Sequence, residues 1–152
     1  MTRAATPPSI ARMAQGFRTF DHTGDLGLEI EADDPARLFA LAAEALMAQI
    51  ADVPAGAAPD RAADVAVEAA DPEALLVDWL NAALLEAELA GAVWTRARVH
   101  AWSPRAIRAT LSGPRLDRSR MTLLREVKAV SHHALELVLD PPRCRARVVL
   151  DL

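Results

Sequence analysis

The sequence is poor in several residue types, and each shortage excludes a class of protein or of site. Of its 152 residues, one is cysteine, none is tyrosine and 4% are aromatic. A single cysteine excludes an intramolecular disulfide framework and a cysteine-based zinc site, and it fits a reducing compartment. With so few aromatic side chains, a surface that binds single-stranded RNA by base stacking is not expected. The phosphate-binding motifs GxxxxGK and GxGxxG and the zinc motif HExxH are also missing.

Long hydrophobic runs are missing as well. The most apolar stretch, residues 74–91, is interrupted by four polar or charged residues between Asp78 and Glu88. It therefore falls short of the roughly 18 apolar residues that a membrane-spanning helix needs. The N-terminus lacks the apolar segment of a signal peptide. We expect a flexible extension over residues 1–16, a single domain over residues 17–152, no membrane partner and a cytoplasmic location.

Charge is divided unevenly along the chain. Residues 1–94 have 5 basic and 16 acidic side chains, whereas residues 95–152 have 12 basic and 5 acidic ones. Two interpretations are open: the basic half binds a polar partner, or acidic helices and basic strands complement one another within the fold. Lys128 is the only lysine among the 17 basic residues. Because lysine has a compact ammonium head where arginine has a broad planar fork, this position is a candidate for a specific contact.

Apolar periodicity and breaker residues predict two main helices and several strands. Asp34-Pro35 and Asp71-Pro72 each join an N-cap to a first-turn proline, and Gly91 suits a helix C-terminus. The predicted helices run over about 35–51 and 72–90. Strands are predicted over about 17–32, with a turn near Gly24, and over 63–69. A strand hairpin is predicted at 93–113 and a final pair of strands at 126–151. These elements do not alternate as βαβ units. We therefore expect an α+β fold, a single two-layer domain with a mostly antiparallel sheet packed by two main helices.

The turn at residues 21–25 is the first candidate site. Asp21, His22, Thr23 and Asp25 place four oxygen- or nitrogen-bearing side chains between two strands. Clustered oxygen ligands in such a turn can hold a divalent cation; alternatively, the side chains stabilise the turn by bonding to their own backbone. A turn this small cannot fill six or seven coordination positions, so a metal here would need ligands from elsewhere in the chain.

The end of the sequence is the second candidate site. Asp151 follows an apolar strand and lies one residue from the terminal carboxylate at Leu152. Two anions this close repel unless a cation, an arginine or solvent separates them. A frayed, solvated terminus is the alternative.

One cysteine and two histidines, residue types that often take part in catalysis, are interpreted as structural. Cys144 has no histidine nearby in the sequence and is expected to be a small strand side chain. Strand alternation predicts that His132 and His133 face opposite sides, with Lys128 and Val130 on the same side as His132. Both histidines are expected to be buried and hydrogen-bonded.

Five segments, in order, resemble the archease family. They are HTGDLG at 22–27, DPARLFALAAEAL at 34–46, EALLVDWLNAALL at 73–85, EVKAVSHH at 126–133 and VVLDL at 148–152. The resemblance runs from about Phe17 to Leu152. Two positions depart from the usual family pattern: Gly24 replaces an alanine, and His132 replaces a tyrosine. The stretch at 113–124 departs more.

The resemblance implies a set of functional residues. A calcium-type metal site would be formed by Asp25, Asp151 and an oxygen of Leu152, which joins the two candidate sites above into one. Lys128 matches a functional position of the family, and with His22 it is expected to act on the partner. A divalent cation, calcium, is the expected cofactor.

The resemblance also implies a function. Family members are small α+β proteins that serve as cofactor proteins for the GTP-dependent RNA ligase of tRNA splicing and RNA repair. They promote formation of the ligase's histidine–guanylate intermediate and allow multiple turnover, without ligation chemistry of their own. We therefore expect a non-catalytic protein whose partner is the ligase and which meets RNA only indirectly. Two alternatives stay open: a chaperone-like modulator of an RNA- or DNA-modifying enzyme, and a metal-dependent hydrolase using His22, Asp25 and Asp151.

Overall fold

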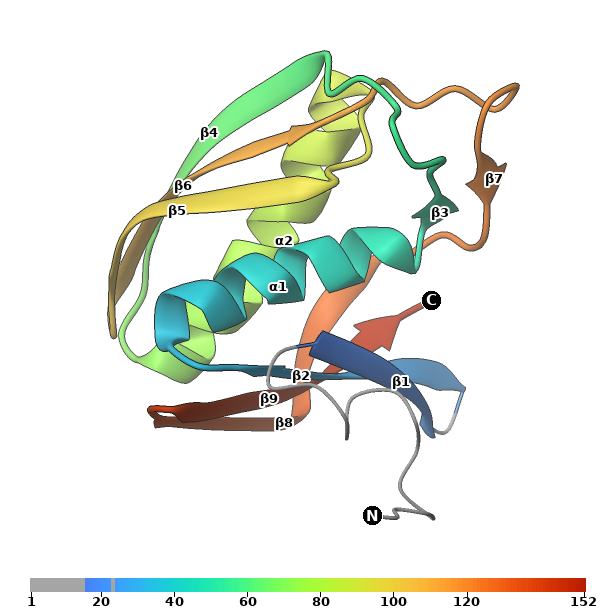
Figure 1. Cartoon of the computed structure of the whole chain (residues 1–152). Coiled ribbons are helices and arrows are strands. Elements are labelled where there is room, and N and C mark those ends of the chain that lie inside the picture. Colours follow the sequence, from blue (N-terminus) through green and yellow to red (C-terminus); the bar gives the residue numbers. More distant parts are fainter. Residues whose placement is uncertain (1–15, 23) are drawn as a thin grey trace, which may run out of the picture.

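The structure is a computed structural model that describes residues 16–22 and 24–152. Figure 1 shows the order of its elements, two helices and nine strands. In chain order they are β1 (Gly16–His22), β2 (Asp25–Ala32), α1 (Pro35–Ala48), β3 (Ala51–Asp52), β4 (Arg61–Glu68), α2 (Pro72–Ala90), β5 (Arg96–Ser103), β6 (Ala106–Gly113), β7 (Thr122–Leu123), β8 (Ala129–Asp140) and β9 (Arg143–Asp151). Neither described helix is long and apolar enough to span a bilayer. The expected N-terminal extension lies outside the described residues, apart from Gly16.

Both helices begin as the sequence predicts. The side chains of Asp34 and Asp71 accept hydrogen bonds from backbone N–H groups three residues later, each at 2.8 Å, and a proline follows each cap. Helix α2 ends at Gly91, whose φ of 60° is the left-handed conformation that glycine adopts without a Cβ penalty. Helix α1 ends at Ala48, before the predicted end near residue 51, because Ala51 and Asp52 pair with β7 as a short strand.

All strand pairs are antiparallel, and they form three sheets. Sheet A has the order β1-β2-β9-β8, sheet C has the order β4-β6-β5, and β3 and β7 form a two-stranded ribbon. The predicted hairpin at 93–113 is β5 and β6, and the predicted final pair is β8 and β9. The α+β class with antiparallel strands and two main helices is confirmed.

The helices lie between sheets A and C (Figure 1). Helix α1 contacts β2 of sheet A and β5 of sheet C, and α2 contacts β8 of sheet A and β4 of sheet C. The layers are therefore sheet, helices, sheet, in place of the two layers expected. The physical reason is that α1 is apolar around most of its circumference: eight of its 14 residues are buried, more than one sheet can cover.

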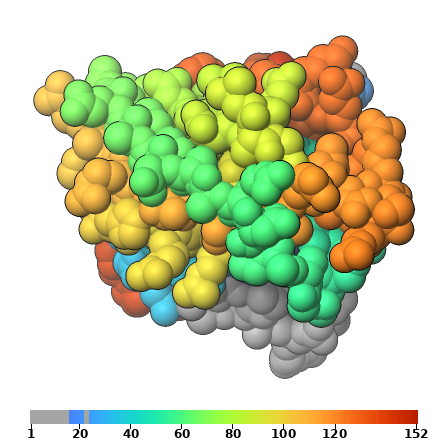
Figure 2. All heavy atoms as spheres, turned by 90° about the horizontal axis from the view of Figure 1, so that it is seen from above, coloured from blue at the N-terminus to red at the C-terminus, as the bar shows by residue number. Residues whose placement is uncertain are grey.

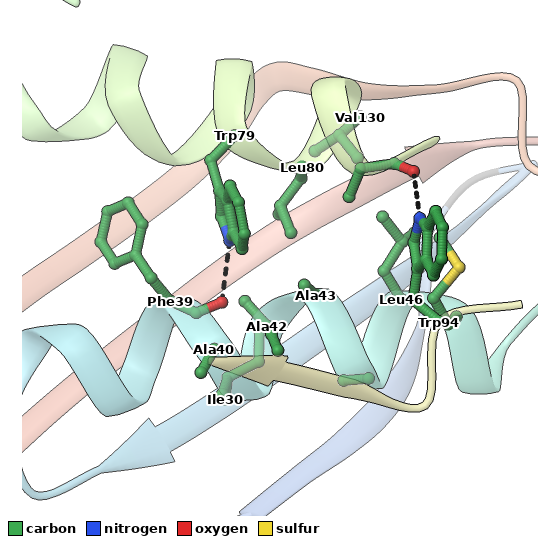
Figure 3. Packing of buried hydrophobic residues seen from close by; sticks show 14 of the residues in the cluster. Ile30, Phe39, Ala40, Ala42, Ala43, Leu46, Trp79, Leu80, Trp94 and Val130 are labelled. Atoms are coloured by element: carbon green, nitrogen blue, oxygen red, sulfur yellow. Dashed lines mark hydrogen bonds between the residues drawn. The ribbon is translucent and has the colours of Figure 1, made fainter. Parts of the chain in front are cut away.

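Two tryptophans connect α2 to α1 and to the segment before β5. Trp79 and Trp94 are almost completely buried. Figure 3 shows Trp79 pointing from α2 to α1, where its indole N–H donates to the Phe39 carbonyl at 2.9 Å. The indole N–H of Trp94 donates to the Ala83 carbonyl at 3.1 Å. Each large apolar ring is thereby buried without an unsatisfied polar atom.

The strand predicted over 126–140 is shorter and less regular than expected. It begins at Ala129, so Lys128 lies just before it, and its register with β9 shifts between Ser131 and Glu136. The predicted burial of His132 and His133 is wrong, since both are exposed, and simple alternation does not apply to them. The reason is this bulge, which lifts residues 132–135 out of the ladder and includes Ala134 at a φ of 57°.

Candidate metal and partner-binding site

Three strand ends meet at one end of sheet A. In β2 and β9, Leu26 pairs with Leu150, so extending this register by one residue puts Asp25 opposite Asp151. Leu150 is fully buried, and Asp25 and Asp151 are half-buried. A buried strand thus holds each carboxylate at the point where the sheet meets solvent. Two residues 126 positions apart in the sequence become neighbours in this way.

The start of β8 completes this end of the sheet. Ala129 pairs with Asp151, and the backbone N–H of Lys128 donates to the Asp151 carbonyl at 2.8 Å. The Lys128 side chain is exposed, as is that of Leu152. The structure therefore brings together four of the residues predicted to form the site: Asp25, Asp151, Leu152 and Lys128.

His22 is the fifth predicted residue. It ends β1, where it pairs with Asp25, and the turn continues through Gly24 at a φ of 73°. Glycine suits this left-handed conformation, and no atom lies within 4 Å of the place where a Cβ would be. Thr23 and the side chain of His22 lie outside what the structure describes. The backbone nonetheless puts His22 beside Asp25.

Asn81 of α2 fixes the start of β8, and the sequence analysis missed this role. Its Nδ2 donates to the Val130 carbonyl at 3.1 Å, and its Oδ1 accepts from the Val130 N–H at 2.8 Å. The side-chain amide thus pairs with the free edge of β8 as a neighbouring strand would. The only signal in the sequence was that Asn81 is the single amide residue of this helix.

The donor chemistry of this end fits a hard divalent cation. Carboxylates opposite one another on neighbouring antiparallel strands have β-carbons about 5 Å apart, and both can reach one ion. Calcium takes oxygen ligands from carboxylates, backbone carbonyls and water. Within the part of the chain that the structure describes, no three His, Cys, Asp or Glu side chains form a metal-binding group. A cation held by Asp25 and Asp151 would therefore need other oxygens, such as main-chain oxygens of Leu152.

The outer face of sheet A, away from the helices, carries an internally paired charge network next to this site. Glu29 accepts from Arg18 at 2.6 Å and lies 3.2 Å from the Arg147 guanidinium, which also contacts Glu136 at 3.8 Å. The same guanidinium lies 4.1 Å from the centre of the Phe20 ring. The arginines on this part of the sheet are thus neutralised by the protein's own acids.

Similarity to known proteins agrees with the fold described above. Residues 17–152 match the model of the Archease protein family. The chain belongs to the archease family. A protein archease of Methanopyrus kandleri is 30% identical over 142 residues, covering 90% of this chain and 99% of the relative. A protein archease of Methanosarcina barkeri is 28% identical over 140 residues, covering 90% of this chain and 95% of the relative.

A solved structure supports the same archease assignment. The solution structure of Methanobacterium thermoautotrophicum protein 1598 superposes with a TM-score of 0.69 at 27% identity. It covers 90% of this chain and 99% of that one. The family identified from five sequence motifs is therefore confirmed, and so is the fold that it implied.

Cys144 behaves as the sequence analysis expected. It is 1% exposed in β9, and its Sγ lies 3.9 Å from the Asp33 carbonyl. Burial raises the pKa of the Cys144 thiol, which disfavours the reactive thiolate. This sulfur is a packed strand side chain.

Proposed function

We propose that this archease is a non-catalytic accessory protein that activates a GTP-dependent RNA ligase, as the family resemblance implies. The supporting observation is the convergence of Asp25, Asp151 and Lys128 at one end of sheet A, from three different strand ends. One polar, partly exposed tip then carries both signs of charge. A partner's active site can receive such a tip without any reaction on the accessory protein itself.

Each residue of the tip has a separate role in this proposal. Asp25 and Asp151 would hold a calcium ion, together with an oxygen of Leu152. The cation would supply positive charge to phosphate oxygens. Lys128, exposed and anchored through its own N–H, would place an ammonium group on a phosphate or carboxylate in the ligase pocket. His22 would contact the partner from the adjacent turn.

The physical basis is positioning and electrostatics. Guanylate transfer to the ligase histidine is a phosphoryl transfer, which depends mainly on alignment and on stabilising charge at the phosphoryl group. Groups that are fixed before the reaction stabilise that charge without reorganisation. Because β9 and α2 hold Asp151 and the β8 start in place, the tip meets this condition.

The test is guanylylation of the ligase by labelled GTP, with RNA omitted, with and without the accessory protein. We expect Asp151→Asn and Lys128→Met each to reduce stimulation at least tenfold. Asp140→Asn is the matched control, since Asp140 is an exposed aspartate at the opposite end of the same strand pair. Its stimulation should equal that of the wild type. Full stimulation by folded Asp151→Asn and Lys128→Met variants would refute the proposed tip.

A further inference from the structure

Sheet C has an outer face, turned away from the helices, that no part of the proposed function uses. Along its strands buried and exposed residues alternate. Val65, Ala97 and Ile107 are buried toward the helices, whereas Arg98 and Arg108 are exposed on the outer face. In Figure 2 the green residues of β4 lie at the surface beside the yellow and amber residues of β5 and β6. This surface is open to a partner.

Three arginines of this face form no ion pair with the residues that the structure describes. Arg96 and Arg98 of β5 are opposite Ser112 and Thr110 of β6, and Arg108 of β6 is opposite Ala101. No ion pair within 4.0 Å joins any of the three to an acid among the described residues. On the outer face of sheet A, Arg18 and Arg147 pair with Glu29, whereas Arg143 and Arg145 of β9 have no ion pair within 4.0 Å among the described residues. Sheet C therefore presents three guanidinium groups on β5 and β6, beside two exposed carboxylates on β4, Asp64 and Glu68.

A hydrogen-bonded chain across the three strands holds one of these acids, Asp64, by a neutral hydroxyl group. Thr110 of β6 donates its single hydroxyl proton to Asp64 of β4 at 2.7 Å. The same oxygen lies 2.7 Å from Nε2 of His100 and must accept from it, because its own proton is used. Asp64 therefore accepts a hydrogen bond from Thr110 and keeps its negative charge.

A bulge brings His100 onto this face. The register of β5 against β6 shifts between Val99 and Ala101, so His100 is the extra residue. Such a bulge redirects a side chain relative to simple alternation. With Nε2 donating to Thr110, Nδ1 is the ring nitrogen of His100 that this hydrogen bond does not use, on a side chain that is exposed. A further polar group therefore lies among the arginines.

Apart from Glu68 at the end of β4, the remaining side chains of the face are small. Ala62, Ala66, Ala101 and Ser112 lie between the charged residues, and the described part of this face has no exposed aromatic or large aliphatic side chain. Protein–protein interfaces depend on buried apolar or aromatic anchors, which are missing here. Stacked bases would also need aromatic rings. A polyanion, bound through its backbone by the arginines of β5 and β6, is the partner that this surface fits.

We propose that the outer face of sheet C binds the sugar–phosphate backbone of an RNA strand. Arg96 and Arg98 are two residues apart on one strand, hence about 7 Å from each other, which is similar to the separation of successive phosphates along an extended strand. Guanidinium forks bind phosphate through paired hydrogen bonds. Binding is independent of base sequence, because no group here reads base edges. This surface goes beyond the ligase-activating tip and departs from the expectation that RNA is met only indirectly.

The experiment measures binding of a fluorescein-labelled 12-nucleotide oligouridine by the full chain. The variant is Arg96→Gln/Arg98→Gln/Arg108→Gln, and the control is Arg118→Gln/Arg143→Gln/Arg145→Gln, three exposed arginines off this face. Each phosphate contact on a single strand contributes roughly 0.7 to the slope of log affinity against log salt. Loss of three contacts should lower that slope by about 2 and the affinity at 0.1 M salt roughly 100-fold. The control should lose less than about fivefold.

Several outcomes would overturn the proposal. The first is no binding of the oligouridine at low salt, and the second is an equal loss of affinity in the variant and the control. The third is that polyglutamate displaces the labelled oligouridine as effectively as unlabelled RNA does, which would indicate an acidic protein partner. Circular dichroism and thermal unfolding establish that the variant is folded. Guanylylation of the ligase without RNA should remain at the wild-type level in the Arg96/Arg98/Arg108 variant, whereas Asp151→Asn should keep RNA binding and lose guanylylation. Failure of this proposal is therefore distinguishable from failure of the proposed function.

Discussion

Replacing Asn81 with leucine tests whether α2 holds the start of β8 in place. Leucine branches at Cγ as asparagine does, with bulkier methyl groups, but cannot form either hydrogen bond to Val130, at 3.1 and 2.8 Å. The backbone N–H and carbonyl of Val130 then lie without partners at a residue that is 4% exposed. We expect the free energy of unfolding to fall by about 3 kcal/mol, from two lost hydrogen bonds and two desolvated backbone groups, partly offset by apolar burial.

Thermal and chemical unfolding measure this change. For a chain of this length, about 3 kcal/mol corresponds to a lowering of the melting temperature by roughly 6–12 °C. Glu88→Leu is the control, since it introduces the same side chain at an exposed position of α2 and should change stability by less than about 0.5 kcal/mol. Amide exchange at Val130 and Lys128 should also accelerate in the Asn81→Leu variant.

The refuting result is equally specific. If Asn81→Leu unfolds within about 0.5 kcal/mol of the wild type and exchange at Val130 is unchanged, the amide does not secure the strand edge. The account of how Lys128 is positioned would then be wrong. A stable variant that still stimulates the ligase fully would lead to the same conclusion.

Three other predictions concern sites away from the tip. Gly113→Ala should lower the free energy of unfolding in urea by more than about 2 kcal/mol, because the new Cβ would overlap the Val93 carbonyl. Gly56→Ala, where the Cβ would meet open space, should lower it by only about 1 kcal/mol, and equal decreases in the two variants would refute this prediction. Two hydrogen bonds from Ser119 lower the pKa of Asp117, so the stabilisation from this pair is present above the ordinary carboxyl range and is lost as pH falls through the lowered pKa. Ser119→Ala should raise the pKa of Asp117 toward its usual value in an NMR titration, and an unchanged pKa would contradict the assignment. Burial raises the pKa of Cys144, so a thiol reagent at neutral pH should label it only as the protein unfolds, and rapid labelling of the native state would show the burial to be wrong.

Local signals made the helices predictable from sequence. An N-cap aspartate with a following proline, or a glycine at a helix end, acts within one turn, so Asp34, Asp71 and Gly91 are recognisable without tertiary information. The end of α1 was harder to predict. It depends on Ala51 pairing with Leu123, a contact between segments more than 70 residues apart.

The candidate site was predictable only by resemblance. From the residues alone, Asp25 and Asp151 are two separate and ambiguous signals, because their meeting depends on the register of β2 against β9. The bulge in β8 was missed, although the apolar positions change from the even-numbered Val130 to the odd-numbered Leu135 and Leu137 across it, and this error reversed the expected burial of His132 and His133. Asn81 was recognised as polar but not as a partner of β8, because its acceptor and donor are backbone groups.

The most direct test of the proposed function is sealing of a broken RNA by limiting ligase with GTP, with and without this protein. The account predicts more than one sealed RNA per ligase molecule only when the wild-type protein is present. Asp25→Asn and Asp151→Asn should reduce the yield to about one per ligase, and Asp140→Asn should leave the wild-type yield. Absence of stimulation by the wild-type protein, with a ligase from the same organism, would contradict the account and favour the chaperone-like alternative.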